Sequence, residues 1–494
     1  MGDRAPANLP ARCMVLSGLM QFSSPDCNRL SMTKVMTKLH LRLLPVVAVV
    51  FLAACASQQQ PPQPPIEPPA EFTRTGQPVV PDSWWTSFDD EQLDSLVTRA
   101  LEDNLGLRAS YQRLRQARAV ADRQRAGLFP SLDATAGAER QETDTTNTDT
   151  FSAGLSARYE VDLWGRVQSL SEAESLRASA TLADYQAAAI SLSGEIANTW
   201  FQLVEQRAQL ALAESQLETN ENVLTVIESR FAMGQNNSAD VLRQRQLVSA
   251  SRERLSNIEG EAGVLRHQLA VLLGQSPGQG VLPEDDTLPA LPPLPETGVP
   301  AELVQRRPDL QQAWRVVQAA DRDLAAAISN RFPRFSIEAS INSQANDAGD
   351  LFDNWLATLA GNLLVPLVDG GERRAEVRRS EAVLGELVQE YGQAVLVAIR
   401  EVEDALVREQ QQRRRLRSLD EQSQLADTTY RQLRNQYLNG AVSYIDVLTA
   451  LQDRQDLQRT ILNTRQQLLT TRVALYRALA GSIESATPME NNEA

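Results

Sequence analysis

The sequence lacks the side chains from which most enzyme sites are built. Its 494 residues include only two histidines, His40 and His267, and its three cysteines, Cys13, Cys27 and Cys55, all precede the main part of the chain. No phosphate-cradling glycine loop, zinc-type histidine pattern or nucleophile elbow occurs. The sequence therefore predicts no enzyme, no cofactor and no metal site, and no disulfide framework in the main part of the chain.

Basic charge, aromatic residues and long apolar runs are also scarce. The formal net charge is −15, which argues against a nucleic-acid partner because phosphate contacts need a basic surface. No run of about 20 apolar residues follows residue 55, so no transmembrane helix is expected there. Aromatic residues make up only 5%, whereas alanine, leucine, glutamine, arginine and glutamate are abundant, as in long helices or coiled coils.

Residues 1–54 predict an export signal. A basic stretch at 34–42 precedes the short apolar run LLPVVAVVFLAAC, which is too short for a spanning helix. Its ending, LAAC, resembles a bacterial lipobox, which implies cleavage before Cys55 and lipid attachment to its thiol; the alternative is an ordinary signal peptide with a chance cysteine. The residues before about Met32 do not fit a signal peptide. The true start is therefore expected near Met32 or Met36, after a mis-called N-terminal extension.

Two proline-rich segments divide the rest of the chain. Residues 55–82 are expected to form an extended, lipid-anchored tether, and residues 282–300 a linker. The linker joins two repeats, 83–281 and 301–482, and a polar tail follows at 483–494. Four pairs of similar segments, in the same order and about 205 residues apart, indicate the repeat. One pair is LFPSLDATAG and RFPRFSIEAS; another is RFAMGQNNSADVL and QYLNGAVSYIDVL.

Each repeat predicts two strands, a very long helix and a shorter helix. In the first repeat the strands are expected at about 129–140 and 151–163, the long helix at about 165–233 and the shorter helix at about 239–274. In the second repeat the corresponding ranges are about 332–344, 354–367, 371–438 and 442–480. Few prolines or glycines interrupt the long helices, which would reach ~100 Å. The moderate helix that opens each repeat and the shorter helix that closes it are expected to stack end to end along the long one.

The strands alternate strictly between apolar and polar residues. In FSAGLSARYEVDL the odd positions from Phe151 to Leu163 are apolar, and the even positions from Ser152 to Asp162 are polar or glycine. Alternation alone favours a soluble sandwich, but a sandwich needs about seven strands. If the strands cross a membrane, four cannot close a barrel, and an open edge in lipid leaves unpaired backbone groups. Several chains would then share one barrel, with lipid on the apolar face and water on the polar face.

Several motifs together resemble the outer membrane factors of the TolC superfamily, in the lipoprotein branch that is NodT-like or OprM-like. They are LAAC; WWTSFDDEQLDSLVTRALEDNLGLRAS from Trp84; LFPSL, DLWGR and RRPDL; and the paired turns FAMGQNNSADVL and YLNGAVSYIDVL. The similarity covers about 81–482. Each motif is weak alone, but their order is specific.

The resemblance implies an α+β membrane protein with a trimeric TolC-like fold. Each chain would give four strands to a shared twelve-stranded outer-membrane β-barrel, continuous with a periplasmic α-helical barrel. It also implies an exit duct for drugs or other small toxic compounds, opened when a periplasmic adaptor and an inner-membrane transporter dock. The expected transporter is of the resistance–nodulation–division class. An ATP-driven exporter (type I secretion or MacB-like) is the alternative, and a lipid-anchored periplasmic coiled-coil scaffold is a further one.

The resemblance also implies a periplasmic gate near two tip turns, whose glycines Gly234 and Gly440 are expected to hold positive φ and to mark the adaptor-docking surface. Asp240 and Asp446 lie six residues beyond these glycines and match acidic gate positions. The alternative is that they serve as first-turn or cap residues of the following helices.

Two further residues match gate positions of the family, and two depart from its pattern. Tyr437 matches a gate tyrosine, and Ile445 matches an apolar constriction. Thr449 stands where many relatives carry an inward aspartate, and Val442 where some carry a basic residue. The sequence therefore does not identify the full set of residues that close the gate.

Overall fold

The computed structural model describes residues 62–63, 65–77, 79–279, 281–284, 286–481 and 483. The chain divides into two units, Met1–Pro61 and Pro62–Ala494, and every described residue belongs to the second. The predicted signal peptide, the predicted lipid-attachment residue Cys55 and nearly all of the polar tail therefore lie outside the described residues.

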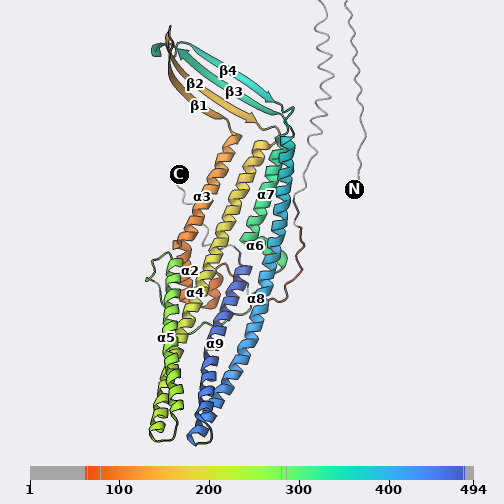
Figure 1. Cartoon of the computed structure of the whole chain (residues 1–494). Coiled ribbons are helices and arrows are strands. Elements are labelled where there is room, and N and C mark those ends of the chain that lie inside the picture. The colour runs from red at the N-terminus through yellow and green to blue at the C-terminus, as the bar shows by residue number, and fades with distance from the viewer. Residues whose placement is uncertain are drawn as a thin grey trace, which may run out of the picture. The chain divides into compact units, whose positions relative to one another are not determined.

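The described chain runs through two successive series of helices and strands (Figure 1). The first contains α2 (Glu91–Asp103), α3 (Leu105–Arg125), β1 (Ser131–Glu142), β2 (Asn147–Val161), α4 (Arg166–Ala232) and α5 (Ser238–Leu272). The second contains α6 (Pro300–Arg306), α7 (Pro308–Ser329), β3 (Arg334–Ala345), β4 (Trp355–Leu364), α8 (Glu372–Leu438) and α9 (Tyr444–Leu479). Short 3-10 helices are η1 (Trp84–Phe88), η2 (Ala126–Leu128) and η3 (Ala348–Asp350).

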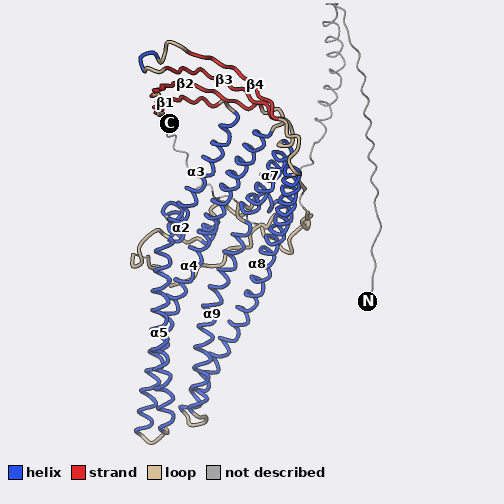
Figure 2. The backbone as a smooth tube through the Cα atoms, turned by 45° about the horizontal axis from the view of Figure 1, so that its top comes forward, coloured by secondary structure: helices blue, strands red, loops and turns tan. Residues whose placement is uncertain are grey.

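The helices pack side by side in the same order as the strands. The four strands form one antiparallel sheet in the order β1-β2-β3-β4. Near the sheet, α3 packs on α4, α4 on α7 and α7 on α8; towards the tips, α5 packs on α4, α4 on α9 and α9 on α8. This order follows from the chain, because α3 leads into β1, β2 into α4, α7 into β3 and β4 into α8. Figure 2 shows the strands at one end of the helices and the two tip turns at the other.

The shorter helices meet end to end along the long helix, as their lengths predicted. Both α3 and α5 pack against α4. Asn104, between α2 and α3, donates from Nδ2 to the carbonyl oxygen of Leu272 at the end of α5, at 2.8 Å. The same Asn104 accepts from the amide of Leu107 at 2.9 Å and so caps α3. One side chain thus joins the two stacked helices.

The strands end at places that alternation alone does not indicate. β1 and β2 continue into the predicted polar loop 141–150, because Gln141 pairs with Thr148 and Glu142 with Asn147. The turn is therefore confined to residues 143–146. Backbone pairing explains the difference, since a ladder can continue through polar residues. β4 ends at Leu364 rather than at about 367, before Pro366, which has no amide hydrogen for a ladder.

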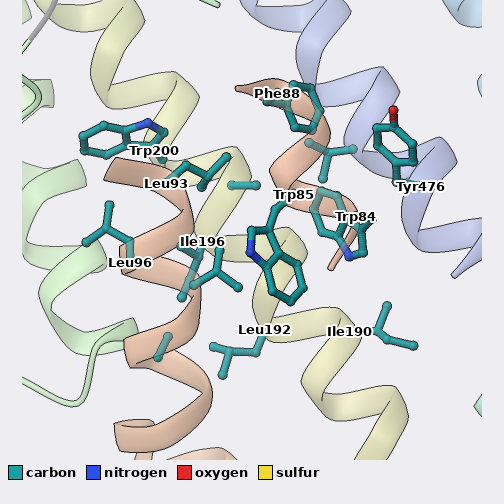
Figure 3. Close-up of a cluster of buried hydrophobic side chains, with 14 of the residues drawn as sticks. Trp84, Trp85, Phe88, Leu93, Leu96, Ile190, Leu192, Ile196, Trp200 and Tyr476 are labelled. Carbon is teal, nitrogen blue, oxygen red and sulfur yellow. The ribbon is translucent and has the colours of Figure 1, made fainter. Parts of the chain in front are cut away.

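An aromatic core lies where the first helices meet α4 and α9. Trp84, Trp85 and Phe88 of η1 are buried, and Trp84 stacks on Tyr476 of α9 with ring centres 5.8 Å apart. Figure 3 shows these rings with the apolar side chains that surround them, among them Leu93 and Leu96 of α2 and Ile190, Leu192 and Ile196 of α4.

A hydrogen bond connects this core to the start of α2. Asp90 accepts from the amide of Leu93 at 2.9 Å, which caps α2, and from Nε1 of Trp200 at 2.7 Å. The helix α2 was not anticipated from the sequence, although its capping residue and apolar spacing are present there.

The two proline-rich segments lie against the helices. Phe72, inside the predicted tether, is buried in a cluster with side chains of α7, α8 and α9. The hydroxyl and the amide of Thr73 both donate to the carboxylate of Glu403 on α8. Gly76 donates from its amide to the carbonyl of Pro295 in the linker at 2.9 Å. A Cβ at Gly76 would lie 1.7 Å from the carbonyl oxygen of Leu294, so only glycine allows this close approach.

One described helix passes a test of length and composition for a membrane span. α8 contains an 18-residue window with a hydropathy of 1.2, of which 22% is buried. Core helices of soluble proteins pass the same test, so one such helix is weak evidence for a span. Tyr391 and Val395 of α8 share a buried apolar cluster with Leu310 and Val317 of α7. Tyr391 and Val395 therefore pack against a neighbouring helix.

Candidate functional site

The sheet has one mainly apolar face, which also includes Ser343 and Gly361. In the observed register Leu155 of β2 lies opposite Ala134 of β1 and Ile341 of β3, and Ile341 lies opposite Ala357 of β4. The same face carries Leu132, Ala136, Ala138, Phe151, Ala153, Ala157, Tyr159, Val161, Phe335, Ile337, Ala339, Trp355, Leu359 and Leu363. Many of these side chains are open to the surroundings; Leu359 is 78% exposed. The four alternating patterns therefore combine into one apolar surface.

The opposite face of the sheet is mainly polar. Arg158 of β2 forms an ion pair with Glu338 of β3 at 3.3 Å. Near the helices, Arg166 and Glu160 form a bidentate pair, with Nη2 and Oε2 2.8 Å apart. β4 is less regular, because Leu356 and Leu364 lie on this face and are exposed.

Aromatic side chains mark both ends of the apolar face. Phe151 and Trp355 lie towards the turns at the outer end, and Tyr159 and Phe335 towards the helices. Next to the sheet, Trp164 donates from Nε1 to the carbonyl of Pro333 at 2.7 Å, and its ring stacks on Phe332. The sheet thus has an apolar band between two aromatic ends.

The two tip turns have the same backbone geometry. Gly234 has φ 73° and Gly440 has φ 76°, in the left-handed region that glycine reaches without strain. Gly234 donates to the carbonyl of Phe231, and the amide of Gln235 donates to Arg230; Gly440 and Ala441 repeat this pattern with Tyr437 and Gln436. Each long helix therefore ends in a Schellman motif.

The two aspartates beyond the glycines occupy the first turns of α5 and α9, as the alternative prediction held. Asp446 forms a capping box with Ser443, whose amide and hydroxyl donate to Oδ2 of Asp446 at 3.1 and 2.6 Å. Asp240 donates from its amide to Oδ1 of Asn237 and is buried, with Oδ1 3.3 Å from Arg243. Asp446 is exposed, so the two equivalent positions differ in their contact with solvent.

Tyr437 connects the two tip turns. Its hydroxyl lies 2.6 and 2.8 Å from the side-chain nitrogen and oxygen of Asn236, in the other turn. The guanidinium of Arg230 lies 4.9 Å from the centre of the tyrosine ring, which is within cation–π range. The sequence indicated Tyr437, whereas Asn236 and Arg230 lie about 200 residues away and were not anticipated.

Ile445 and Thr449 face outward from α9, and Val442 packs in the tip core. Ile445 is 43% exposed. Thr449 lines a groove of about 370 Å³ between α8 and α9, together with Asp446 and Asp453. Val442 is partly buried against a cluster that includes Tyr444 and Leu448. Asp453 was not singled out from the sequence, although it follows Asp446 at a seven-residue interval typical of one helix face.

A buried polar network lies above the tips. The hydroxyl of Tyr444 donates to Oε1 of Gln244, whose Nε2 donates to the carbonyl of Asn220 at 2.6 Å. Asn220 also donates to Ser251 at 2.8 Å and accepts from Gln455 at 3.0 Å. Burial, with Tyr437 and Asp240 nearby, raises the pKa of the Tyr444 hydroxyl above its usual value. The two helical hairpins are therefore joined through groups that single-residue patterns do not reveal.

Among the described residues, no group of three or more histidine, cysteine, aspartate or glutamate side chains is arranged to hold a metal ion. The arrangement consists of a two-faced sheet, long helices and acidic tip turns. It offers a surface to bind other chains or to guide solutes.

Comparisons with known proteins agree on one family. The family model described as outer membrane efflux protein matches residues 96–275 and 299–481. The chain is 34% identical to the pyoverdine export outer membrane protein OpmQ of Pseudomonas aeruginosa, covering 89% of this chain and 96% of that protein. It is 27% identical to the cation efflux system protein CusC of Escherichia coli, covering 89% of this chain and 98% of that protein. A solved structure of the outer-membrane channel OprN is 27% identical and covers 86% of this chain and 99% of that chain, with a TM-score of 0.79.

Proposed function

Because the chain belongs to the outer membrane efflux protein family, we propose that it is the outer-membrane exit duct of a tripartite efflux pump. It conducts drugs or other small toxic compounds passively from the periplasm to the exterior and performs no catalysis. Three copies assemble, and each gives four strands to a twelve-stranded barrel that continues into a helical tunnel in the periplasm.

The observation that carries this proposal is the sheet with one apolar face and two open edges. Among the strands of the described residues, β1 and β4 each have a partner on one side only. An unpaired edge in a bilayer costs several kcal/mol for each unsatisfied backbone group. β4 of one copy therefore pairs with β1 of the next, until the ring closes. The aromatic ends of the apolar band match the interfacial girdles of outer-membrane barrels.

The helices support the same closure. Their order places α3 and α5 at one edge of the layer and α8 at the other; along the chain α3 leads into the edge strand β1, and the edge strand β4 leads into α8. The two edges are different surfaces, so their contact is head-to-tail, and such contacts form a ring when the rotation closes. A barrel and a tunnel then arise from the same rotation.

The lower end carries the gate and the docking surface. Asp446 is exposed, so three copies would place a ring of carboxylates around the axis, which favours cations. Asp240 has the equivalent position but is buried, so Asp446 is the principal acidic gate residue. Tyr437 holds the two hairpins together when the gate is closed, and Ile445 narrows the opening. The turns at Gly234 and Gly440 present the surface for the periplasmic adaptor.

The remaining partners follow from the export signal and from the family. Lipid at Cys55 anchors the chain in the outer membrane. The inner-membrane transporter is of the resistance–nodulation–division class, with an ATP-driven transporter as the alternative. OpmQ is named for pyoverdine export and CusC for cation efflux, so related ducts serve different cargoes, and cargo is selected by the transporter.

Planar-bilayer recording tests this function. The purified protein should migrate as a heat-dissociable oligomer and give discrete conductance steps in lipid bilayers. Deletion of the gene should raise susceptibility to the compounds that the pump exports. A monomer whose strands fold in water and that gives no conductance would contradict the proposal and would favour a lipid-anchored coiled-coil scaffold.

A further inference from the structure

In the half of the helical layer towards the tips, two faces at its edges have no partner among the described residues. One belongs to α8 and the other to α5, which lie at opposite sides of the layer in Figure 1. On α8 the exposed apolar residues include Val407 and Leu425, and on α5 they include Val264 and Val271. At about 100° per residue, Val407 and Leu425 lie on one side of α8, and Val264 and Val271 lie on one side of α5.

The α8 face carries two arginines without a carboxylate partner among the described residues. Arg414 and Arg417 are exposed and form no ion pair within the described chain. Glu409, five residues before Arg414, contacts Arg472 of α9. At 3.6 residues per turn, Arg414 therefore points about 140° away from the side that faces α9. Arg417 follows about one turn further towards the tip.

The α5 face carries a notch bordered by two carboxylates. Gly260 and Gly263 lie inside the helix, and a Cβ built on either would meet nothing within 4 Å. Each glycine costs the helix about 1 kcal/mol relative to alanine. Gly260 points about 180° away from Ser251, which contacts Asn220 of α4. Glu259 and Glu261 beside it are exposed and form no ion pair among the described residues.

The arginines and the notch lie at the same height. The tips are level, because Tyr437 at the end of α8 hydrogen-bonds with Asn236 before α5. Arg414 lies about 24 residues, or about 36 Å, above the end of α8, and Gly260 about 22 residues, or about 33 Å, above the start of α5. Rotation about an axis parallel to the helices preserves height.

We propose that Arg414 and Arg417 of each copy seat on the Gly260–Gly263 notch of the next copy and pair with Glu259 and Glu261. This inference rests on the proposed ring and specifies the contact that holds its helical part together. The glycines let the large arginines approach the α5 backbone, and the carboxylates neutralise them. Val407 of α8 and Val271 of α5, about 31 and 33 residues above the tips, form an apolar contact at the next level.

A charge exchange tests the contact. The paired substitution Arg414→Glu with Arg417→Glu should lower the temperature at which the detergent-resistant oligomer dissociates, and so should Glu259→Arg with Glu261→Arg. The protein that combines all four substitutions should recover a dissociation temperature near that of the wild type. Recovery cannot arise from misfolding, because the combined protein carries more changes than either half.

Two single substitutions provide a matched control and a second readout. Arg415→Glu makes the same charge change as Arg414→Glu at a neighbouring exposed position about 100° round the helix, and it should leave the dissociation temperature unchanged. Gly260→Leu improves the helix propensity of α5 but fills the notch, so it should weaken the oligomer.

The outcomes separate this inference from the proposed function. If the oligomer conducts but neither paired substitution lowers its dissociation temperature, the proposed contact is wrong and the proposed duct is unaffected. Equal losses for Arg414→Glu and Arg415→Glu, or no recovery in the combined protein, also overturn it. A wild-type protein that is monomeric and gives no conductance overturns both.

Discussion

At the tip of α9, the carboxylate of Asp446 accepts hydrogen bonds from the amide and the hydroxyl of Ser443 while remaining exposed. Capping requires only an acceptor at this position, whereas cation selection requires a charge. The equivalent Asp240 has the same place in its helix but is buried beside Arg243. Local sequence context is alike at the two sites, and their surroundings make them different.

Substitutions at the Asp446 cap separate charge from helix capping. Asp446→Asn keeps an acceptor but removes the charge, so the channel should lose part of its preference for cations in planar bilayers. Ser443→Ala removes the hydroxyl from the cap, at about 1 kcal/mol of stability, and keeps the charge. It should leave the ion preference unchanged. Equal shifts in the two variants, or none in Asp446→Asn, would remove Asp446 from the conduction path.

Tyr444 should make the tip sensitive to alkaline pH. Burial, with Tyr437 and Asp240 nearby, raises the pKa of its hydroxyl. Because its pKa is higher in the folded than in the unfolded protein, the folded state holds the tyrosine proton more tightly. The hydroxyl therefore makes its full contribution to the free energy of unfolding below the unfolded pKa of about 10, and this contribution is lost as the pH rises beyond it. Between about pH 9 and pH 11, the free energy of unfolding should therefore fall less in Tyr444→Phe than in the wild type. Chemical unfolding in detergent measures this, and parallel pH dependence in the two proteins would contradict it.

At the scale of elements, the linker is held by a buried arginine. Arg472 of α9 is fully buried; it pairs with Glu409 of α8 at 2.8 Å and donates to the carbonyls of Pro292 and Pro293 at 2.6 and 2.7 Å. The proline-rich composition of 282–300 predicted a linker. That the linker lies against α9 depends on a donor about 180 residues away.

Arg472→Met should destabilise the protein by about 3–5 kcal/mol, the usual cost of breaking a buried ion pair. The change leaves a buried carboxylate and two prolyl carbonyls with fewer donors. Arg465→Met is the matched control, because its ion pair with Asp420 is exposed, with 3.9 Å between the charged atoms, and should contribute about 1 kcal/mol or less. Chemical unfolding in detergent compares the two variants. Equal losses of unfolding free energy in the two variants would show that the buried contact of Arg472 stabilises the protein no more than an exposed ion pair does.

At the scale of the whole molecule, the proposed ring assigns different surroundings to the two faces of the sheet. Leu359 and Thr358 are adjacent on β4 and both exposed, yet they lie on opposite faces. Leu359 belongs to the apolar face and Thr358 to the polar one. Their exposure in a single chain is alike, so only the assembly in a membrane distinguishes them.

Arginine substitutions at these two positions test the assignment. Leu359→Arg should impair insertion into the outer membrane, because an arginine facing lipid near the middle of the bilayer costs about 2–4 kcal/mol. Thr358→Arg should insert normally and shift ion selectivity towards anions. Outer-membrane fractionation and bilayer recording measure the two effects. Normal insertion of Leu359→Arg would contradict lipid contact on the apolar face.

Local patterns were enough for the features that depend on neighbouring residues. Alternation in FSAGLSARYEVDL predicted a two-faced strand, uninterrupted helical stretches predicted the long helices, and the glycines at 234 and 440 predicted turns with positive φ. Each depends on backbone and side-chain preferences within a few residues. The ordered motifs also indicated the protein family, which the comparisons confirm.

Contacts between distant segments had to come from the tertiary structure. The register that aligns Leu155 with Ile341, the Tyr437–Asn236 bond that levels the tips and the burial of Asp240 but not Asp446 all join segments far apart in the chain or depend on packing. A periodic pattern defines the faces of one helix or strand and carries no information about which other element packs on them. That pairing depends on the free energy of the complete folded structure. The opening stretch is therefore a two-faced strand by its own residues, and part of a mainly apolar surface only by pairing.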